Sequence, residues 1–446
     1  MDKDEEEQQK ILEAGARKIC KILQDKGYIA YLAGGCVRDL IMKRHPSDYD
    51  IATNAMPDVV SKYFPNSITL WKNFGVVRVL LSDGEYEVTT FRSDGPYLDG
   101  RHPSTVVFSS PEEDAQRRDF TINALFLDPS NNQILDYVGG QKDIEQGIIK
   151  TVGEPYKRFS EDYLRLLRAA RFSARFKFTI EGETLKAMKE LHEGIKKVSA
   201  ERIRDELVKI LTEGNPQWAF EIMDNVSLLS QILPEVAELK TVEQDPTYHP
   251  EGDVFTHTIL ALQNLKNPSV SLAMAVLLHD IGKKQTITFA VDRIRFPKHE
   301  SIGAQMAQTI MERLRFSRTE IDNVQWLIKN HMTLLQYPQM RESTRKKLFK
   351  NPLFLLLLEL VEVDIKTSYG DLSAIEKIRD DYHTFLQEVP VYQPLLRGRD
   401  LIGLGFTPGP LFKTILNEVE NAQLDGMLKT KEEAIRYVLQ HWQTTR

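Results

Sequence analysis

The spacing of hydrophobic and polar residues changes character near residue 160 of this 446-residue chain. Before that point, short runs rich in valine, threonine and aromatic residues alternate with helical patterns, which predicts a mixed α/β region. The predicted strands are 28–33, 50–52, 76–81, 86–91 and 105–108, and the predicted helices are 5–24 and 36–42. After that point the patterns are mostly helical, beginning with 160–176, 183–192 and 200–212. We therefore expect an α+β head followed by all-α domains.

Turn-rich clusters at 245–252 and 389–394 divide the helical part further. The domains expected from these breaks are a head at 1–150, a helical neck at 151–240, a second helical domain at 241–370 and a helical tail at 371–446.

The charge of the chain is unevenly distributed. Apolar residues make up 41% and charged residues 27%, as in a globular protein. The net charge of −6 argues at first against a nucleic-acid partner, because nucleic-acid-binding domains are usually basic. However, the segment 157–177 carries seven basic residues against only Glu161 and Asp162. Since phosphate recognition requires a local basic surface and not a basic protein, such a partner stays open.

Cysteine usage and the N-terminus indicate the compartment. The two cysteines, Cys20 and Cys36, exclude a disulfide framework and a cysteine-rich zinc site. Residues 1–10 are acidic and polar, unlike a secretory signal. The longest apolar run, 352–363, is interrupted by two glutamates and is too short to span a bilayer. We expect a soluble cytoplasmic protein with both thiols reduced.

A glycine pair begins the chemistry of the head. Gly34 and Gly35 lie between a predicted strand and the helix 36–42. Backbone N–H groups at a glycine-rich helix start can approach phosphate oxygens, and the helix dipole favours an anion there. Arg38, in the first turn of that helix, is within reach of a triphosphate. Because a glycine pair alone is more often a tight turn, the pattern needs support from its neighbours.

Two aspartates provide that support. Asp48 and Asp50 enter the next predicted strand, where alternation puts both carboxylates on one face. Adjacent oxygen ligands suit Mg²⁺, and two such ions can hold the attacking and leaving oxygens of a phosphoryl transfer. Glu87, in the strand 86–91, is either a third carboxylate near the metal or a solvent-facing strand residue.

These motifs continue in a fixed order. They are GGxVRD at 34–39, DxD at 48–50, RRDFTINA at 117–124, DYVGG at 136–140 and EDYLRLLRAARF at 161–172. Together they resemble the bacterial tRNA nucleotidyltransferases, in the class that also includes bacterial poly(A) polymerases. The resemblance implies a head of the polymerase-β nucleotidyltransferase type with Mg²⁺ at Asp48 and Asp50. It also implies transfer of C and A from CTP and ATP to the 3′ end of tRNA, with release of pyrophosphate.

The resemblance also assigns a base-reading role to two residues. Asp162 would accept a hydrogen bond from the exocyclic amine of the incoming base, and Arg165 would donate to its ring nitrogen or carbonyl. Cytosine and adenine carry that amine where uracil and guanine carry an oxygen, so a wrong base would face the carboxylate as an unpaired acceptor. The protein itself would thus act as the template.

The remaining nucleotide-binding residues follow from the same resemblance. They are Gly35, Arg38, Arg118, Arg168 and Arg171, the last two near the sugar and phosphates, while Asp119 and Asn123 would organise the pocket. By spacing alone, Asp162, Arg165, Arg168 and Arg171 lie three residues apart on a predicted helix, which is also the pattern of a solvated basic helix with an ion pair.

The segment 91–101 matches a mobile loop that, in the resembled family, is thought to help the switch from C to A addition. The residues in or next to this segment that would drive the switch, here called lever residues, are Asp99, Arg101 and His102. A plain polar loop is an equal alternative.

A second set of polar residues lies in the helical part. In chain order its members are His257, His279, Asp280, His299, His331 and Asp364. Imidazoles and carboxylates in such a series suit one or two divalent transition metals, although a single histidine on a helix is usually structural. The series resembles the all-α HD phosphohydrolase superfamily. This implies a metal-dependent hydrolase of phosphomonoesters or cyclic phosphodiesters, for example at damaged RNA ends, or an inactive, structural domain.

Two basic stretches allow two interpretations each. The segment 397–410 leads into a tail that resembles the C-terminal segment of tRNA nucleotidyltransferases with an HD domain. There Arg397 and Arg399 either contact an RNA backbone or belong to a packed helical cap. The stretch 341–350 either contacts RNA or is a solvated helix face.

Three alternatives to CCA addition stay open. A poly(A) polymerase shares the motifs, although Glu161, Asp162, Arg165 and the PGP sequence at 408–410 favour tRNA. Addition of the terminal A alone is compatible with the loop at 91–101, whose length argues against CC-only addition. Finally, the chain could be mainly an HD phosphohydrolase with an RNA-binding head, which intact Asp48 and Asp50 disfavour.

Overall fold

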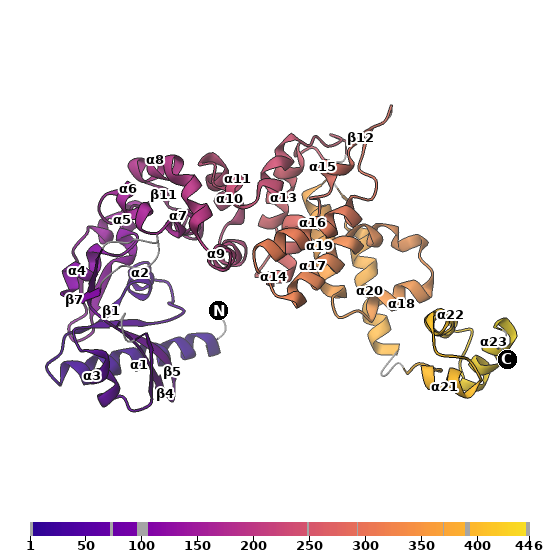
Figure 1. Ribbon diagram of the computed structural model, residues 1–446, viewed down its shortest axis with the longest axis horizontal. Helices are drawn as coiled ribbons and strands as arrows, with labels where there is room; N and C mark the ends of the chain where they lie inside the picture. Colours follow the sequence, from indigo (N-terminus) through magenta and orange to yellow (C-terminus); the bar gives the residue numbers. More distant parts are fainter. Residues whose placement is uncertain are drawn as a thin grey trace. The chain divides into compact units, whose positions relative to one another are not determined.

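The computed structural model describes residues 3–71, 75–95, 106–247, 249–291, 293–368, 370–388 and 393–442. The chain forms two compact units, Met1–Ala237 and Glu238–Arg446, which we describe one at a time (Figure 1). The candidate lever residues Asp99, Arg101 and His102 lie outside the described residues. Within the described ranges, no helix combines the length and the apolar character needed to cross a membrane.

A mixed sheet organises the first unit. Over the described residues it has seven strands in the order β3-β4-β5-β2-β1-β8-β9. They are β1 (Ala30–Ala33), β2 (Asp50–Thr53), β3 (Ser67–Trp71), β4 (Val76–Leu81), β5 (Gly84–Thr90), β8 (Leu125–Asp128) and β9 (Gln133–Asp136). β2 runs antiparallel to β1, with Asp50 opposite Ala33, and parallel to β5, with Ile51 opposite Val88. Asp50 therefore starts its strand beside the end of β1, where the glycine pair follows.

The predicted strands agree with this sheet except at its far strands. The pattern at 76–81 coincides with β4, and the patterns at 50–52 and 86–91 fall on β2 and β5 within a few residues. The predicted strand 105–108 is β7 (Val106–Phe108), which pairs with β6 (Arg92–Asp94) outside the main sheet. β3, β8 and β9 were not predicted. A further parallel pair joins β10 (Ile148–Ile149) to β11 (Thr179–Ile180).

Helices complete the first unit. They are α1 (Lys3–Gln24), α2 (Gly35–Ile41), α3 (Pro57–Tyr63), α4 (Pro111–Gln116), α5 (Gly140–Gln146), α6 (Pro155–Glu161), α7 (Leu164–Phe176), α8 (Gly182–Leu191), α9 (Ala200–Glu213), α10 (Pro216–Asn225), α11 (Leu229–Ile232) and α12 (Pro234–Ala237), with 3-10 turns η2 (Thr121–Asn123) and η3 (His192–Lys197). Side-chain caps define several starts. Ser110 caps α4 and Asn215 caps α10 by accepting from a backbone N–H of the first turn.

The predicted continuous helix at 160–176 is wrong. α6 ends at Glu161, and Asp162 is extended, with φ −154° and ψ 103°, before α7 starts at Leu164. Asp162 Oδ1 accepts from the Leu164 N–H at 3.1 Å, so the aspartate satisfies a backbone donor at the start of α7 instead of continuing the helix.

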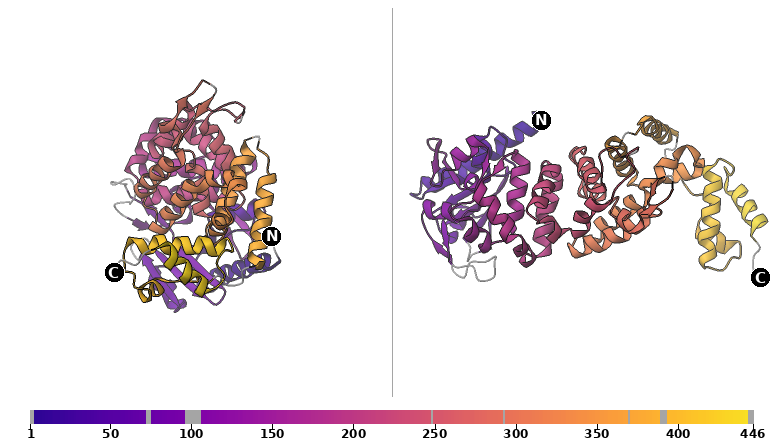
Figure 2. Two further views of the ribbon diagram at one scale, coloured as in Figure 1. Left: turned by 90° about the vertical axis from the view of Figure 1, so that its right-hand side faces the viewer. Right: turned by 90° about the horizontal axis from the view of Figure 1, so that it is seen from above.

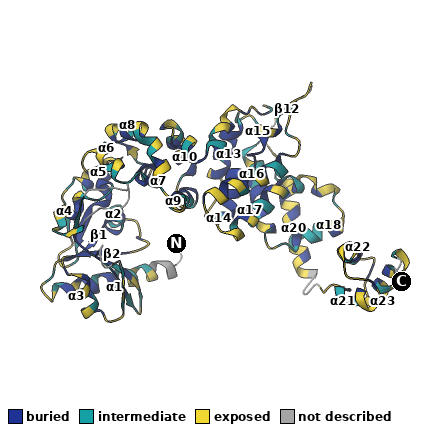
Figure 3. Ribbon diagram, viewed as in Figure 1, coloured by how far each residue is buried: buried dark blue, intermediate teal, exposed yellow. Residues whose placement is uncertain are grey.

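The second unit is mostly helical among the described residues. Its helices are α13 (Val254–Gln263), α14 (Val270–Leu278), α15 (Lys283–Thr286), α16 (His299–Arg313), α17 (Arg318–Asn330), α18 (Glu342–Phe349), α19 (Phe354–Thr367), α20 (Ser373–Glu388), α21 (Gly398–Gly403), α22 (Pro410–Leu424) and α23 (Lys431–His441), with η4 (Glu238–Thr241), η5 (His331–Gln339) and the hairpin of β12 (Thr288–Phe289) and β13 (Ile294–Arg295). α14 is apolar on all sides and buried along almost its whole length, as a central core helix must be (Figure 3).

The tail has an apolar cluster of its own. Leu401 of α21, Ile415 and Val419 of α22, and Ala434 and Val438 of α23 are buried against one another. These three helices lie together in Figure 1 and in both views of Figure 2. They match the alternative of a packed helical cap.

The basic stretch 341–350 forms α18, and its lysines bind neighbouring helices. Lys346 donates to the Leu424 carbonyl, and Lys350 pairs with Glu420 at 3.2 Å. Lys347 also bonds α22, through Asn417. These contacts give the stretch a structural role in attaching α22.

Candidate active sites

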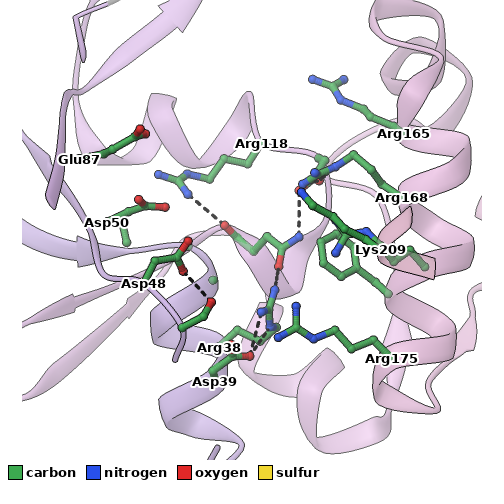
Figure 4. A pocket seen from close by; sticks show the side chains of 18 of the residues that line it. Arg38, Asp39, Asp48, Asp50, Glu87, Arg118, Arg165, Arg168, Arg175 and Lys209 are labelled. Atoms are coloured by element: carbon green, nitrogen blue, oxygen red, sulfur yellow. Dashed lines mark hydrogen bonds and ion pairs between the residues drawn. The ribbon is translucent and has the colours of Figure 1, made fainter. Parts of the chain in front are cut away.

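A cavity of about 670 Å³ in the first unit collects the motifs of the head. Figure 4 shows Asp48, Asp50 and Glu87 on one wall, with Arg165, Arg168 and Lys209 on the wall opposite. The acidic wall comes from β2, β5 and the turn before β2, while the basic wall comes from α7 and α9. The structure thus brings all nine predicted head residues into one cavity: Gly35, Arg38, Asp48, Asp50, Arg118, Asp162, Arg165, Arg168 and Arg171.

The acidic wall repels additional negative charge. Desolvation by the surrounding protein, reinforced by Asp48 and Glu87, raises the pKa of Asp50 to about 7, although Arg118 opposes the shift. The side chain nevertheless faces the open cavity, as do Asp48 and Glu87. Glu87 is also bound at 3.3 Å by Arg78 of β4. Carboxylates that repel one another in an open cavity are a donor set that fits Mg²⁺.

Glycine is required at position 34 by its surroundings. Gly34 has φ +73°, a left-handed conformation, and a side chain there would come within 2.7 Å of Arg118 Nη1. Arg118 occupies that space because Asp114 holds its Nε and Nη2 at 3.1 Å and the Asn123 carbonyl holds its Nη1. The glycine therefore places a cation directly at the start of α2.

Arg38 lines the cavity but is itself buried. Its Nε and Nη2 bind Asp39 at 2.8 Å, and Nη1 donates to the side chain of Asn123. The guanidinium also lies over the ring of Phe176 at 4.6 Å. Burial lowers the pKa of Arg38 below its usual value. These contacts hold Arg38 as a fixed donor at the base of the cavity.

Asp119 and Asn123, expected to organise the pocket, are hydrogen-bonded to each other and to the basic wall. Asp119 Oδ2 accepts from Arg168 at 2.6 and 2.8 Å, and Oδ1 accepts from Asn123 at 3.1 Å. Burial opposes ionisation of Asp119, but the pairing with Arg168 outweighs it and lowers the pKa to about 2. Asp136, in the DYVGG motif, has a different role, since it accepts from four backbone N–H groups in the turn before α5.

The proposed base readers lie at the junction of α6 and α7. Asp162 does not pair with Arg165. Instead, Arg202 donates hydrogen bonds to both of its carboxylate oxygens, at 3.1 and 2.7 Å. Arg165 Nη1 donates to the Arg158 carbonyl at 2.7 Å and to Glu161 at 2.8 Å. The alternative interpretation, a solvated helix with an ion pair at this spacing, fails at Asp162, because the break there turns its carboxylate toward α9.

Sequence reasoning missed the contribution of α9. Arg202, Glu206, Lys209 and Glu213 recur at helical spacing, and Glu206 is a buried acid that binds Arg171 at 2.6 Å and Arg168 at 3.5 Å. The other three line the cavity. A charged stripe on an otherwise amphipathic helix was the available signal.

The second unit brings the histidine series together beside a second cavity of about 740 Å³, which Asp280, His299, His331 and Asp364 line. His257 Nε2 lies 3.0 Å from Asp364 Oδ1, and His279 Nε2 lies 3.2 Å from Asp280 Oδ2. Asp280 Oδ1 lies 3.4 Å from His299 Nε2. The six predicted residues form two adjoining groups. Within each group, the candidate ligand atoms lie within 4.8 Å of one another. They are His257, His279 and Asp364 in one group, and Asp280, His299 and His331 in the other.

The hydrogen bonds of the four histidines fix their tautomers. The Nδ1 atoms contact backbone carbonyls in three cases: His279 to Val276 at 2.8 Å, His299 to Phe296 at 2.9 Å and His331 to Ile328 at 2.6 Å. His257 Nδ1 contacts Glu251 at 2.6 Å. Since a carbonyl only accepts, each of these three Nδ1 atoms carries the proton, and the Nε2 atoms present lone pairs.

Those lone pairs point toward one another. His299 Nε2 and His331 Nε2 are 3.2 Å apart, and both rings are buried. His257 Nε2 and His279 Nε2 are buried without a well-aligned hydrogen bond, and Asp280 Oδ2 lies 3.2 Å from His279 Nε2 and 2.7 Å from the Lys283 ammonium. Converging acceptors at this distance repel unless a cation lies between them, and histidines oriented through Nδ1 are typical of metal ligands. The donor set therefore fits a divalent transition metal.

The charges of the second cavity depend on whether a cation is bound. Burial opposes protonation of His257, but Asp364 and Glu251 raise its pKa to about 9, so this ring holds a proton between the two carboxylates that a bound metal would displace. Burial, together with His279, lowers the pKa of His331 to about 4, so this ring is neutral at ordinary pH. Burial opposes ionisation of Asp280, but His279 and Lys283 hold its pKa well below the usual range.

A glycine makes this cluster possible. A side chain at Gly282 would lie 2.3 Å from the His299 carbonyl, so only glycine lets the segment after α14 approach the start of α16. That approach brings Asp280 and His299 together.

Comparisons with known proteins identify three segments. Residues 30–150 match the family described as "Poly A polymerase head domain", residues 177–240 match "Probable RNA and SrmB- binding site of polymerase A", and residues 299–439 match a second domain of tRNA nucleotidyltransferases.

Whole proteins are similar as well. The CCA-adding enzyme of Lactobacillus helveticus is 44% identical over 230 residues, which are 51% of this chain and 57% of that protein. This chain thus spans little more than half the length of that relative. The CCA-adding enzyme of Enterococcus faecalis is 29% identical over 427 residues, 94% of each protein. The crystal structure of the Bacillus stearothermophilus CCA-adding enzyme in complex with CTP matches with a TM-score of 0.72 at 26% identity, over 95% of this chain and 96% of that one. These similarities confirm the predicted fold class, a polymerase-β-type head followed by helical domains.

Proposed function

This chain belongs to the family of bacterial tRNA nucleotidyltransferases and poly(A) polymerases, and from that premise we propose that it adds C and A to the 3′ end of tRNA, using CTP and ATP. One observation carries the proposal. Asp48 and Asp50 line the same cavity as the pair Asp162 and Arg165, and Figure 4 shows Arg165 across that cavity from the two aspartates. A carboxylate set for phosphoryl transfer and a set for reading a base therefore act on the same nucleotide.

The acidic wall holds the reacting groups. Asp48 and Asp50, with Glu87 beside them, hold Mg²⁺, which when bound neutralises charge on the phosphates and lowers the pKa of the attacking 3′-hydroxyl. Arg118 and the N–H groups at Gly35 lie next to this wall and bind phosphate oxygens. Because Asp114 and Asn123 already fix Arg118, little ordering is needed when the triphosphate arrives.

The basic wall selects the base. Asp162 accepts from the amine of cytosine or adenine, and the Nε and Nη2 of Arg165 donate to the neighbouring ring atom. Uracil or guanine would bring an oxygen against the carboxylate, and an unpaired buried acceptor costs about 1–3 kcal/mol. Arg168 and Arg171, locked by Asp119 and Glu206, line the path of sugar and phosphates.

The relatives support these substrates. Proteins named CCA-adding enzyme match this chain, one of them over 94% of its length, and the similar Bacillus stearothermophilus structure is a complex with CTP. The proposed division into head, neck, second helical domain and tail, and a cytoplasmic location, belong to the same proposal.

The test is addition to defined tRNA ends. The protein, Mg²⁺, CTP and ATP are incubated with tRNA ending at the discriminator base, in C or in CC, and the products are sized on a sequencing gel. We expect completion to CCA from all three ends and no addition with UTP or GTP. Addition only to the CC end would replace the proposal by A-only addition. Long A tails on an unrelated RNA would indicate a poly(A) polymerase instead.

We propose a second activity for the helical unit, metal-dependent hydrolysis of a phosphomonoester or cyclic phosphodiester. The orientation of the four histidines through Nδ1 favours it, since the freed Nε2 atoms face two carboxylates. Lys283, 2.7 Å from Asp280, brings a cation to the same cavity, where it suits a phosphate.

Hydrolysis of p-nitrophenyl phosphate and of a nucleoside 2′,3′-cyclic phosphate with Mn²⁺ or Ni²⁺ tests this activity. Release of product that stops with a chelator is expected. Absence of any release from both substrates would assign the unit a structural role.

A further inference from the structure

Arg202 controls the orientation of the Asp162 carboxylate. Its Nη1 donates to Oδ1 at 3.1 Å and its Nη2 to Oδ2 at 2.7 Å, which is the two-pronged geometry of guanidinium with carboxylate. Both side chains line the cavity of the first unit, and both are largely shielded from solvent, with 24% of Arg202 and 16% of Asp162 exposed.

The hydrogen bonds leave one acceptor position on Asp162. A carboxylate offers about four lone pairs, two on each oxygen. Oδ1 accepts from Arg202 and from the Leu164 N–H, so both of its lone pairs are used. Among the residues that the structure describes, Oδ2 accepts from Arg202 alone. The remaining lone pair of Oδ2 is thus the single place where one N–H of an incoming base can bind.

Existing hydrogen bonds also limit the number of N–H donors that Arg165 can offer to a base. Both Nη1 hydrogens are used, by the Arg158 carbonyl and by Glu161. Its Nη2 contacts the Arg117 carbonyl only weakly, at 3.5 Å, so Nε and one Nη2 hydrogen stay available. The pair therefore presents one acceptor and two donors of fixed direction.

The support for Arg202 is rigid. It lies on α9, whose Ile203, Leu207 and Ile210 are buried. Four residues after Arg202, Glu206 binds Arg171 and Arg168 of α7, so α9 is tied to the helix that carries Arg165. The terminal torsion of an aspartate is soft, and without the guanidinium the carboxylate can turn.

We propose that Arg202 is a positioning residue for base selection, acting by orienting Asp162 so that one lone pair of Oδ2 receives the base amine. The inference rests on the proposed nucleotidyltransferase function. It adds that specificity depends on a third side chain that contacts no part of the base.

Arg202→Gln tests the proposal through discrimination, measured as the ratio of kcat/KM for CTP to that for UTP on tRNA ending in C. We expect the ratio to fall about ten- to hundredfold, the effect of losing a hydrogen bond to a charged group. Arg202→Lys keeps the positive charge but loses the paired donors of the guanidinium, so we expect its ratio to fall as well. This variant provides the test if the glutamine variant does not fold. Full discrimination by either folded variant would overturn the proposal.

Two further variants separate orientation from general damage. Arg204→Gln, on the same helix and paired with Asp205, should leave the ratio unchanged. The double variant Arg202→Gln, Asp162→Asn should discriminate no worse than Asp162→Asn alone, because Arg202 acts through Asp162. If the double variant discriminates less well than Asp162→Asn alone, Arg202 does not act through Asp162. A wild type that accepts all four nucleotides would overturn the proposed function as well, whereas a selective wild type with an equally selective Arg202→Gln would overturn only the role of Arg202.

Discussion

The cavity of the first unit and the cavity of the second are both lined by ionisable side chains, but their charges are arranged differently. In the first, the arginines Arg118, Arg165 and Arg168 are held by carboxylates or carbonyls, and the carboxylates Asp48 and Asp50 repel each other on the opposite wall. In the second, imidazoles and carboxylates converge in two adjoining groups, and Lys283 pairs with Asp280 beside them.

This difference indicates what each cavity is prepared to bind. Paired arginines keep donors of fixed direction for an anion, while the acidic wall adds a cation site, so a triphosphate with Mg²⁺ suits the first cavity. Imidazoles and carboxylates that converge within ligand distance suit a bound metal in the second. The same residue types, acids and bases, thus make two kinds of site because their partners differ.

The largest expected effect separates the two sites completely. Asp48→Ala combined with Asp50→Ala should lower nucleotide transfer by about a thousandfold or more, because the loss of metal ligands removes several kcal/mol of charge stabilisation. Hydrolysis by the second unit should be unchanged in the same protein. The measurement is incorporation of labelled CTP into tRNA, with Glu85→Ala, an exposed acid on the strand of Glu87, as the matched control. Transfer that survives the double change would refute the metal assignment.

The reciprocal change is Asp280→Ala. Asp280 contacts both histidine groups, so its loss should reduce Mn²⁺- or Ni²⁺-dependent hydrolysis to background while tRNA addition continues at the wild-type rate. Both rates are measured on one preparation. If transfer falls in parallel with hydrolysis, the two cavities are not independent.

How far the sequence predicts these sites depends on whether the decisive contact is local. Short motifs led to Asp48, Asp50 and the histidine series, which the structure brings together, and β4 was predicted with its bounds. The break at Asp162 was missed because apolar residues continue on both sides of it, at Phe159 and Leu164. The sequence therefore keeps a helical pattern through a point where the backbone leaves the helix.

Long-range partners were out of reach of the sequence. The contact between Asp162 and Arg202 spans 40 residues and depends on how α9 packs on α7. β8 and β9 were missed because their recognition depends on the pairing of β8 with β1 and of β9 with β8 rather than on a long alternating pattern. The hydrogen bonds that fix the histidine tautomers run to backbone carbonyls, which no residue pattern records.

A smaller effect, on metal affinity, tests whether the hydrogen bond at His257 Nδ1 orients this ring as a metal ligand. Glu251 accepts from His257 Nδ1 at 2.6 Å, and removing such an outer partner weakens metal affinity about 10- to 100-fold. Glu251→Gln should therefore shift Mn²⁺ binding, measured by calorimetry, by that factor. Glu243→Gln changes an exposed acid of the same segment and should have no effect. Equal affinities in all three proteins would argue that His257 is not a ligand.

The smallest effect concerns the stability of the first unit without metal. Because the pKa of Asp50 is about 7 in the folded protein, against an ordinary value of 3.8, the folded state retains a proton that the unfolded state loses. This contribution to stability is complete below about pH 4 and is lost as the pH rises through about 7. Asp50→Asn does not titrate, so in a chelator it should unfold at a higher temperature than the wild type, with a larger difference at pH 8 than at pH 5. We expect a difference of about 2 °C at pH 8, since water in the cavity screens the charge. Calorimetry with added Mg²⁺ provides the control: the cation should remove the advantage of the variant by stabilising only the wild type. An advantage that is independent of both pH and Mg²⁺ would show that the repulsion on the acidic wall does not create the metal site.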